Sequence, residues 1–386
     1  LFVGRVIMKI HRSIPIVALA IVSYLMVLQW NADYGQAELP PPVTTQTASS
    51  DLPETSTPAA VSDDVPSATT TSGDVVNSPS TAVSDKLIRV QTDVFDLAID
   101  PLGGDIVQLK LPLFPRRQDR PDVPFQLFNN DPSQLYLAQS GLTGANGPDA
   151  RANGRPLYSA SQSNYKLEDG QDQLVVELTF SEAGVNYLKR FTFKRGMYDL
   201  GVSYRIDNQS GQTWSGNLFA QLKRDASPDP SSSTATGSAT YLGAALWTAH
   251  KPYTKVSMSN MDSAPLKENV QGGWVAWLQH YFVTAWTGKA DAQNHIYGKA
   301  VSVNADVKDS GEAIIGIKLP LTTIAANSEA VVGTSLWIGP KLQDQMAAVA
   351  QHLDLTVDYG YLWFIAQPLF QLLQFILLPM IQNLGR

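Results

Sequence analysis

An apolar stretch near the N-terminus, residues 13–30, constrains this chain more than any other segment. Residues 14–28 carry no charge, and their polar groups are the side chain of Ser23 and the hydroxyl of Tyr24. As a helix these roughly 18 residues rise about 27 Å, close to the roughly 30 Å hydrocarbon core of a bilayer. We therefore expect a transmembrane anchor. Its membrane-facing and interfacial residues are predicted to be Ile14, Val17, Leu19, Ile21, Leu25, Leu28 and Trp30.

Basic residues flank this stretch on one side. Arg5, Lys9 and Arg12 precede it, and no Lys or Arg follows before Lys86. Cytoplasmic flanks of membrane helices are enriched in Lys and Arg, so we expect the N-terminus in the cytoplasm and the rest of the chain outside. A cleaved signal peptide is the alternative. Its apolar region would span about 7–15 residues, and Gly-Gln-Ala at residues 35–37 is a poor cleavage site, which favours a retained anchor.

The next segment is poor in large apolar side chains. Pro, Ser, Thr, Ala and Asp dominate residues 37–84, and no aromatic residue lies between Tyr34 and Phe95. Such a segment cannot bury enough apolar surface to offset its ordering entropy. We expect a disordered tether, with a root-mean-square span of roughly 35–40 Å for about 48 residues. A mucin-like or adhesive role is the alternative.

From residue 86 the chain alternates apolar and polar residues with a period of two, the pattern of half-buried strands. No long amphipathic helix pattern separates these runs, which excludes a βαβ architecture. We expect a mainly β domain, one large antiparallel sandwich over residues 86–339. The runs with this period are residues 88–92, 97–99, 107–111, 174–180, 191–193, 200–206, 315–317 and 331–337.

Two loops are rich in small and polar residues. Residues 138–158 contain several glycines, but not in the spacing of a P-loop or of a dinucleotide-binding turn. We expect this loop to be a long surface connection. The other loop, residues 225–240, is polar and expected to be mobile.

The densest aromatic run, residues 272–286, contains Trp274, Trp277, Tyr281, Phe282 and Trp286. One interpretation is a platform that stacks sugars or peptides, with His280 as an acid or base. The other is a pair of core strands whose rings fill a wide sandwich. His280 has no Asp or Glu near it in the sequence, and the pattern favours the core interpretation.

From Pro340 the apolar period becomes helical. Leu342, Met346, Val349 and Leu353 share one helix face, so we expect a helical linker over residues 340–358.

The segment 359–386 is strongly apolar but carries a narrow polar stripe, Gln367, Gln371 and Gln374. A membrane-spanning helix would bury these three amides and two prolines. An interfacial helix keeps the amides in the headgroup layer, and we favour it over the spanning alternative. Its membrane-facing residues are predicted to be Trp363, Phe364, Phe370, Leu373 and Phe375.

Composition narrows the classes of function. The net charge of −7 and the pI near 5.2 argue against a nucleic-acid partner. The chain has no Cys, which removes disulfides and thiolate chemistry. Its five His lack the spacing of a metal site. We expect no catalytic residue, no cofactor and no metal.

Four segments together resemble the YidC-type bacterial membrane protein insertases in their Gram-negative form. They are the anchor with NADYGQ after it, the loop AQSGLTG with GPD and ANGRPLY, the aromatic run GGWVAWLQHYFVTAW, and residues 337–376. The last is the most specific, because its order and spacing resemble the family's junction between periplasmic domain and membrane core. The resemblance covers about residues 8–376.

The resemblance implies a β-supersandwich in the periplasm, similar to sugar-mutarotase sandwiches, held at the inner membrane by the first helix. It also implies insertion, folding and assembly of nascent membrane proteins, alone or with the Sec translocon, in contact with the lipid bilayer. The family's five-helix membrane core does not appear before Arg386, so we expect the chain by itself to lack insertase activity. The expected organisation is a cytoplasmic N-terminus (1–12), the anchor (13–30), a linker (31–85), the β domain (86–339), a helical linker (340–358) and an interfacial segment (359–386).

Two alternatives remain. A membrane-tethered carbohydrate-binding or epimerase-like protein would need His280, His250 or His295 to face a carboxylate in a cleft. A plain scaffold would bind translocon subunits through a strand edge or loop.

Overall fold

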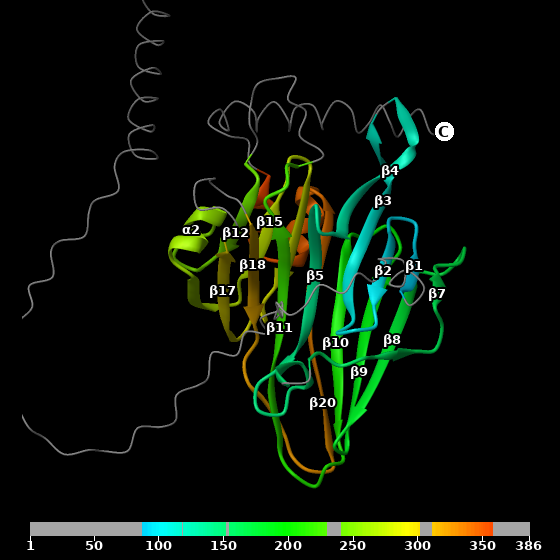
Figure 1. The fold of residues 1–386 in the computed structure, drawn as a ribbon, viewed down its shortest axis with the longest axis vertical. Coiled ribbons are helices and arrows are strands. Elements are labelled where there is room, and N and C mark those ends of the chain that lie inside the picture. The colour runs from blue at the N-terminus through cyan, green and yellow to red at the C-terminus, as the bar shows by residue number, and fades with distance from the viewer. Residues whose placement is uncertain (1–86, 118, 152–153, 230–240, 302–310, 358–386) are drawn as a thin grey trace, which may run out of the picture. The chain divides into compact units, whose positions relative to one another are not determined.

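The computed structural model describes residues 87–117, 119–151, 154–229, 241–301 and 311–357, which form two large β-sheets (Figure 1). The first sheet contains, in spatial order, β14 (Leu266–Gln271), β17 (Gln293–Val301), β18 (Glu312–Lys318), β11 (Trp214–Asp225), β5 (Gln134–Thr143), β4 (Arg120–Asp131), β3 (Asp105–Arg117), β2 (Asp96–Asp100), β1 (Ile88–Gln91) and β7 (Asn164–Lys166), with β19 (Thr322–Ile324) paired to β11. The second contains β13 (Thr254–Val256), β12 (Gly243–Trp247), β15 (Trp274–Leu278), β16 (Phe282–Thr287), β20 (Ser328–Pro340), β10 (Asp199–Asn208), β9 (Val185–Lys194), β8 (Gln173–Glu182) and β6 (Ser159–Ala160).

Helices are few and short in the part of the chain that the structure describes. They are the α-helices α2 (Met258–Ser263) and α3 (Gln343–Val349) and the 3₁₀ turns η2 (Pro148–Ala150) and η4 (Leu353–Thr356). The expected mainly β supersandwich is therefore confirmed. One detail differs from a purely antiparallel fold: β1 pairs with β7 in parallel, whereas the other strand pairs described are antiparallel.

The alternation of apolar and polar residues that predicted the strands matches the alternation of buried and exposed side chains in the structure. In β9 the side chains of Val185, Tyr187, Lys189, Phe191 and Phe193 are buried, and the residues that alternate with them are exposed or half-buried. Successive side chains of a strand point to opposite faces, so one face of β9 contributes to the core. The outer face carries polar residues.

The two sheets pack face to face through large aromatic side chains. Phe125 of β4 stacks on Phe282 of β16 with ring centroids 4.5 Å apart. The indole N–H of Trp286 in β16 donates to the backbone oxygen of Gln221 in β11 at 3.1 Å. A large aromatic ring buries about 150–250 Å², so a few such rings account for much of the wide interior. The fully buried tryptophans are Trp214, Trp274, Trp277, Trp286 and Trp337.

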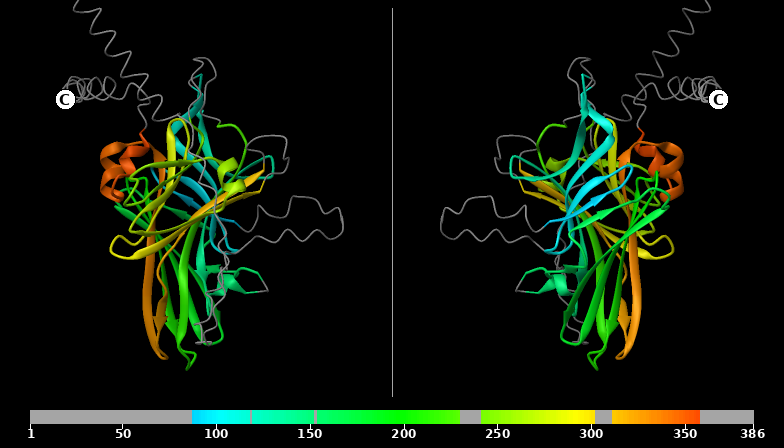
Figure 2. Two further views of the ribbon diagram at one scale, coloured as in Figure 1. Left: turned by 90° about the vertical axis from the view of Figure 1, so that its left-hand side faces the viewer. Right: turned by 90° about the vertical axis from the view of Figure 1, so that its right-hand side faces the viewer.

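Strands β12, β15 and β16 are buried on both faces, which explains why their sequences are mostly apolar, with two buried threonines in β16. One face lies on the core, and α3 with η4 contributes to covering the other. The indole N–H of Trp274 donates to the backbone oxygen of Gln351 at 3.1 Å, and the ring of Trp247 stacks on that of His352. Figure 2 shows this helical segment, in orange and red, on the side of β20 that faces away from β3 and β4.

The helical pattern after Pro340 corresponds to two short helical elements, α3 and η4, and not to one continuous helix. Pro340 is the last residue of β20, and α3 ends at Val349. His352 then adopts a left-handed conformation with φ of 63° before η4 begins. The contacts of Trp247 and Trp274 with residues 351–352 hold this break in place, and such tertiary contacts override the helical period of the sequence.

Candidate functional site

The predicted membrane segments lie outside the described residues. This applies to the anchor residues within 13–30 and to the interfacial residues within 359–386, so both remain predictions. In the described ranges no helix is long and apolar enough to cross a bilayer.

The aromatic run confirms the core interpretation with one exception. Trp274, Trp277, Phe282 and Trp286 are at most 3% exposed. Tyr281, in the turn between β15 and β16, is 59% exposed and is therefore a surface side chain. The run is not a continuous stacking platform, because its large rings lie inside the sandwich.

The three histidines of the epimerase hypothesis come from separate parts of the domain. His250 is exposed in the turn after β12, and His295 lies on β17, where its Nδ1 is 2.9 Å from Oδ1 of Asn269. His280 precedes β16, and its backbone N–H donates to Oδ2 of Asp229 at 2.7 Å. They do not form one constellation.

A buried cluster of charges occupies the place where the sequence predicted a surface connection. Arg155 donates from Nε to Oδ1 of Asp149 at 2.8 Å, from Nη1 to Oδ2 of Asp105, and from Nη2 to the backbone oxygen of Ser140 at 2.8 Å. The side chains of Asp149, Asp105 and Arg155 are 0%, 8% and 18% exposed. The prediction of a surface loop is therefore wrong for these residues.

Lys189 of β9 joins this cluster from the other sheet. Its Nζ donates to the backbone oxygens of Gly103 and Ser140, both at 3.0 Å, and lies 5.3 Å from the ring centroids of Phe191 and Tyr204. The ammonium group thus links the two sheets across the core. None of the charged cluster residues lines either of the two hollows described below, so we interpret the cluster as structural.

The charges in this cluster shift one another's protonation. Burial lowers the pKa of Lys189 to about 7, an effect that the carboxylate of Asp105 opposes. Burial also opposes the charged form of Arg155, but Asp105 and Asp149 outweigh it and raise its pKa. Burial raises the pKa of Asp149 despite the nearby guanidinium.

A sequence signal for Lys189 existed. In VNYLKRFTFK, residues 185, 187, 191 and 193 are large and apolar, and Lys189 has the same parity. A lysine in the middle of an inward-facing row must be buried unless the strand is distorted. The partners of Lys189, by contrast, come from distant segments and carry no such signal.

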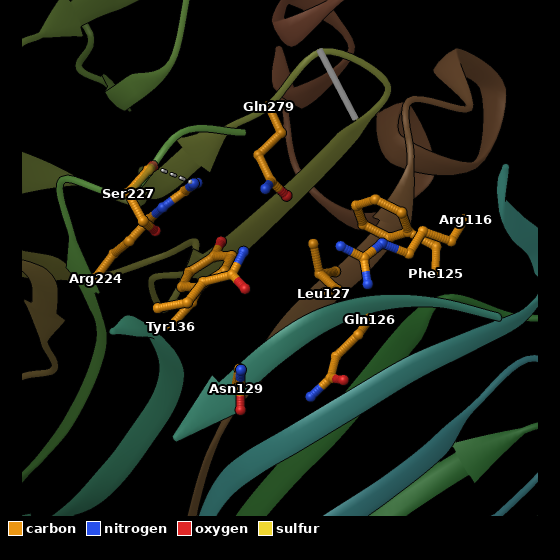
Figure 3. A pocket seen from close by; sticks show the side chains of 10 residues that line it. Arg116, Phe125, Gln126, Leu127, Asn129, Tyr136, Arg224, Ser227 and Gln279 are labelled. Carbon is orange, nitrogen blue, oxygen red and sulfur yellow. Dashed lines mark hydrogen bonds between the residues drawn. The ribbon is translucent and has the colours of Figure 1, made fainter. Parts of the chain in front are cut away.

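A small cavity lies between the ends of β3, β4, β5 and β11 and the turn before β16. Its volume is about 50 Å³, far below the roughly 300–1,000 Å³ of a drug-sized pocket. Figure 3 shows Arg224, Tyr136 and Ser227 on one side and Arg116 with Phe125 and Leu127 on the other. The full lining is Arg116, Phe125, Gln126, Leu127, Asn129, Gln134, Tyr136, Arg224, Ser227 and Gln279.

The lining has a clear chemical bias. It contains two guanidinium groups and several side-chain amides, but no carboxylate and no histidine. An epimerase needs an acid and a base in reach of the sugar, and besides the two arginines the titratable side chain in this lining is Tyr136, whose pKa burial raises. The guanidinium and amide groups of the lining can donate hydrogen bonds to a bound group.

A second hollow of about 380 Å³ lies near η2 and the turns beside β8 and β11. Its polar groups are already engaged: Arg151 pairs with Glu182, and Asn146 accepts from the indole N–H of Trp214 and the backbone N–H of Ser215. It is larger than the first cavity, but these internal pairs leave it less suited to a polar ligand.

Solved structures with a similar chain path include mutarotase-like proteins. One is a galactose mutarotase-like protein from Lactobacillus casei, 12% identical, which matches 65% of this chain and 99% of its own with a TM-score of 0.43. Another is a galactose mutarotase related enzyme from Lactobacillus acidophilus, 10% identical, which matches 65% of this chain and 97% of its own with a TM-score of 0.42.

Curated relatives are far more similar in sequence. Proteins named "Membrane protein insertase YidC" from Pseudomonas putida and Azotobacter vinelandii are each 61% identical over 375 and 371 residues, which is 96% of this chain. The chain spans 65% of the length of these relatives. The family model described as the YidC periplasmic domain matches residues 87–372. The chain therefore belongs to the YidC family, whose periplasmic domain it contains.

Proposed function

We propose that this chain serves in membrane protein insertion, the activity for which its relatives are named. In this proposal the chain contributes an anchor and a periplasmic domain to the insertion, folding and assembly of integral membrane proteins, alone or with the Sec translocon. The observation that carries the proposal is 61% identity across 96% of the chain to proteins named as insertases.

The proposed place of the chain is the bacterial inner membrane. The N-terminus is cytoplasmic, residues 13–30 span the bilayer, residues 31–85 are a tether, and the two-sheet domain is periplasmic. Residues 340–358 link the domain to an interfacial segment at 359–386. The basic residues before the apolar stretch and the match to a periplasmic domain support this arrangement.

The domain's role in this proposal is binding and positioning, not bond chemistry. Its largest rings fill the core, and its three candidate histidines lie on separate elements. The polar cavity lined by Arg224 contains no acid–base pair. These features favour an insertase module over a sugar epimerase.

A chimera tests the proposal. The matching part of the Pseudomonas putida relative is replaced by this chain, and the chimera is expressed in cells depleted of their own insertase. We expect restored growth and insertion of a membrane-protein reporter, with the unaltered relative as positive control. Failure to grow, although the chimera accumulates in the membrane to the level of the relative, would contradict the proposal.

The absence of cysteine makes the orientation directly testable. Single cysteines replace Tyr281, which is 59% exposed, or Arg5 before the anchor. In cells with a permeable outer membrane, an impermeant maleimide should label Y281C but not R5C. Labelling of R5C under the same conditions refutes the proposed topology. Crosslinking from single cysteines at other exposed sites of the domain should capture Sec subunits if the partner is right.

A further inference from the structure

Arg224 of β11 is a buried cation with too few partners. It is 2% exposed, and its Nη2 donates to the backbone oxygen of Ser227 at 3.3 Å. Its Nε and Nη1 have no hydrogen-bond partner among the described residues. An arginine does not lose its proton in a protein, so these two N–H groups remain donors at any physiological pH.

The surroundings of Arg224 compensate its charge only in part. Its guanidinium lies 5.0 Å from the ring centroid of Tyr136 and 5.9 Å from that of Trp277. Asp225 and Asp229 are the carboxylates that act on it electrostatically. Asp225 accepts from the backbone N–H groups of Leu135 and Ser227 instead. A buried charge without a hydrogen-bonded partner destabilises the folded state, which favours an additional ligand.

Arg224 lines the small cavity, and the buried hydroxyl of a second lining residue is close by. The hydroxyl of Tyr136, also in the lining, is buried, and the described side chain beside it that can share a hydrogen bond is Thr284. Burial raises the pKa of Tyr136, so its hydroxyl stays protonated and can donate. Figure 3 shows both side chains on the same side of the cavity, with Arg116 reaching in from the other.

We propose that this cavity binds a small anion, of the size of a carboxylate, between the guanidinium of Arg224 and the hydroxyl of Tyr136. Three features fit this chemistry. The lining contains two guanidinium groups and no carboxylate, the buried Nε and Nη1 of Arg224 have no hydrogen-bond partner among the described residues, and the cavity, at about 50 Å³, is small. Hydrogen bonds from a guanidinium to a carboxylate are among the strongest in proteins.

The carboxylate can come from a free small acid or from the end of a polypeptide. Both sources present the same group to Arg224, and they differ in what must lie outside the cavity. The exposed residues Arg116 and Gln126 at the lining would contact the rest of a peptide, whereas a free acid needs no such contact.

The first test uses the full chain in a mild non-ionic detergent at constant ionic strength. Thermal unfolding, followed by tryptophan fluorescence, is measured with increasing sodium acetate or with acetamide, its neutral isostere. Ligands that bind the folded state raise Tm, so acetate should raise it by several degrees and acetamide should not. A tripeptide with a free carboxyl terminus, compared with its amide, distinguishes a polypeptide end from a free acid.

Three variants test whether the acetate-dependent rise in Tm arises at this cavity. Arg224→Met should abolish the acetate shift, and without acetate it should unfold at or above the Tm of the parent because it removes an unpaired buried charge. Arg116→Gln should weaken acetate binding roughly tenfold or less, as expected for one charge-assisted contact. Arg190→Met, an exposed arginine on β9 paired with Glu177, is the matched control and should leave the acetate shift unchanged.

Equal shifts with acetate and acetamide, or an acetate shift that survives in Arg224→Met, would overturn the proposal. If Arg224→Met does not fold, crystals of the parent soaked in sodium bromide decide the matter. An anomalous peak between Arg224 and Tyr136 supports the site, and an empty cavity refutes it.

Discussion

Replacing Arg155 with methionine tests whether the buried charge cluster stabilises the sandwich. The substitution keeps an unbranched apolar side chain but removes the donors to Asp149, Asp105 and Ser140. Asp149 is 0% exposed at its side chain and loses its only ion-pair partner among the described residues. Removing one member of a buried ion pair costs about 3–5 kcal/mol, so we expect a loss of that size in the free energy of unfolding.

Urea unfolding of the full chain in detergent, followed by the fluorescence of the buried tryptophans, measures this loss. Arg190→Met is the control, because Arg190 and Glu177 form an exposed pair with side chains 47% and 43% exposed. Exposed pairs contribute about 0–1 kcal/mol. A loss below about 1 kcal/mol in Arg155→Met, or one equal to that of the control, would refute the role assigned to the cluster.

The pH dependence gives an independent readout of the same variant. Burial already raises the pKa of Asp149, and the guanidinium opposes this rise. Without Arg155 the folded-state pKa of Asp149 should rise further, so the folded domain takes up a proton that the unfolded chain lacks. The stability of Arg155→Met relative to the parent should therefore increase as the pH falls from 7 toward 5. A constant difference across this range contradicts the reasoning.

Three further substitutions test single residues, two of them in or against the same cluster. Burial lowers the pKa of Lys189 from 10.5 to about 7. Between pH 7 and pH 10.5 the unfolded chain therefore binds a proton that the folded domain lacks, so the stability of the parent should rise with pH in this range. Urea titrations from pH 7 to 10 should show this rise in the parent and not in Lys189→Met. Gly141→Ala should cost about 1–3 kcal/mol by urea unfolding, because its Cβ would lie 2.4 Å from Oδ2 of Asp149. Ala183→Gly should raise the free energy of unfolding by about 0.5–1 kcal/mol. Ala183 has φ of 50° in an exposed turn, and this left-handed conformation is unfavourable for alanine. An unchanged urea midpoint would show that the conformation carries no strain.

The architecture was predictable because one face of most strands is buried. Alternation in β8, β9, β10 and β20 follows directly from that burial. The helical period after Pro340 misled because two tryptophans of β12 and β15 hold residues 351–352 out of helical geometry. These contacts join residues about 75–105 positions apart in the sequence, so the spacing of neighbouring residues cannot reveal them.

The buried polar groups were less predictable than the strands. Lys189 and Arg224 each share the parity of an inward-facing apolar row, β9 and β11 respectively, so a strict count of alternation would have placed both inside. Their partners could not be assigned in this way. The loop that supplies Asp149 and Arg155 is rich in Gly and Asn, and such composition is typical of surface loops.

Arg155 and Arg224 differ in how completely their guanidinium groups are hydrogen-bonded. Each guanidinium nitrogen of Arg155 donates to an acceptor, and two of these acceptors are carboxylates. Arg155 does not line the small cavity. Arg224 is at least as buried, yet it has one weak backbone contact, and it lines a cavity. If burial of arginine served only to join the sheets, both should be saturated. The difference assigns cohesion to Arg155, and it leaves Arg224 with two N–H groups that no described residue accepts from, which is the basis for the anion site that we propose.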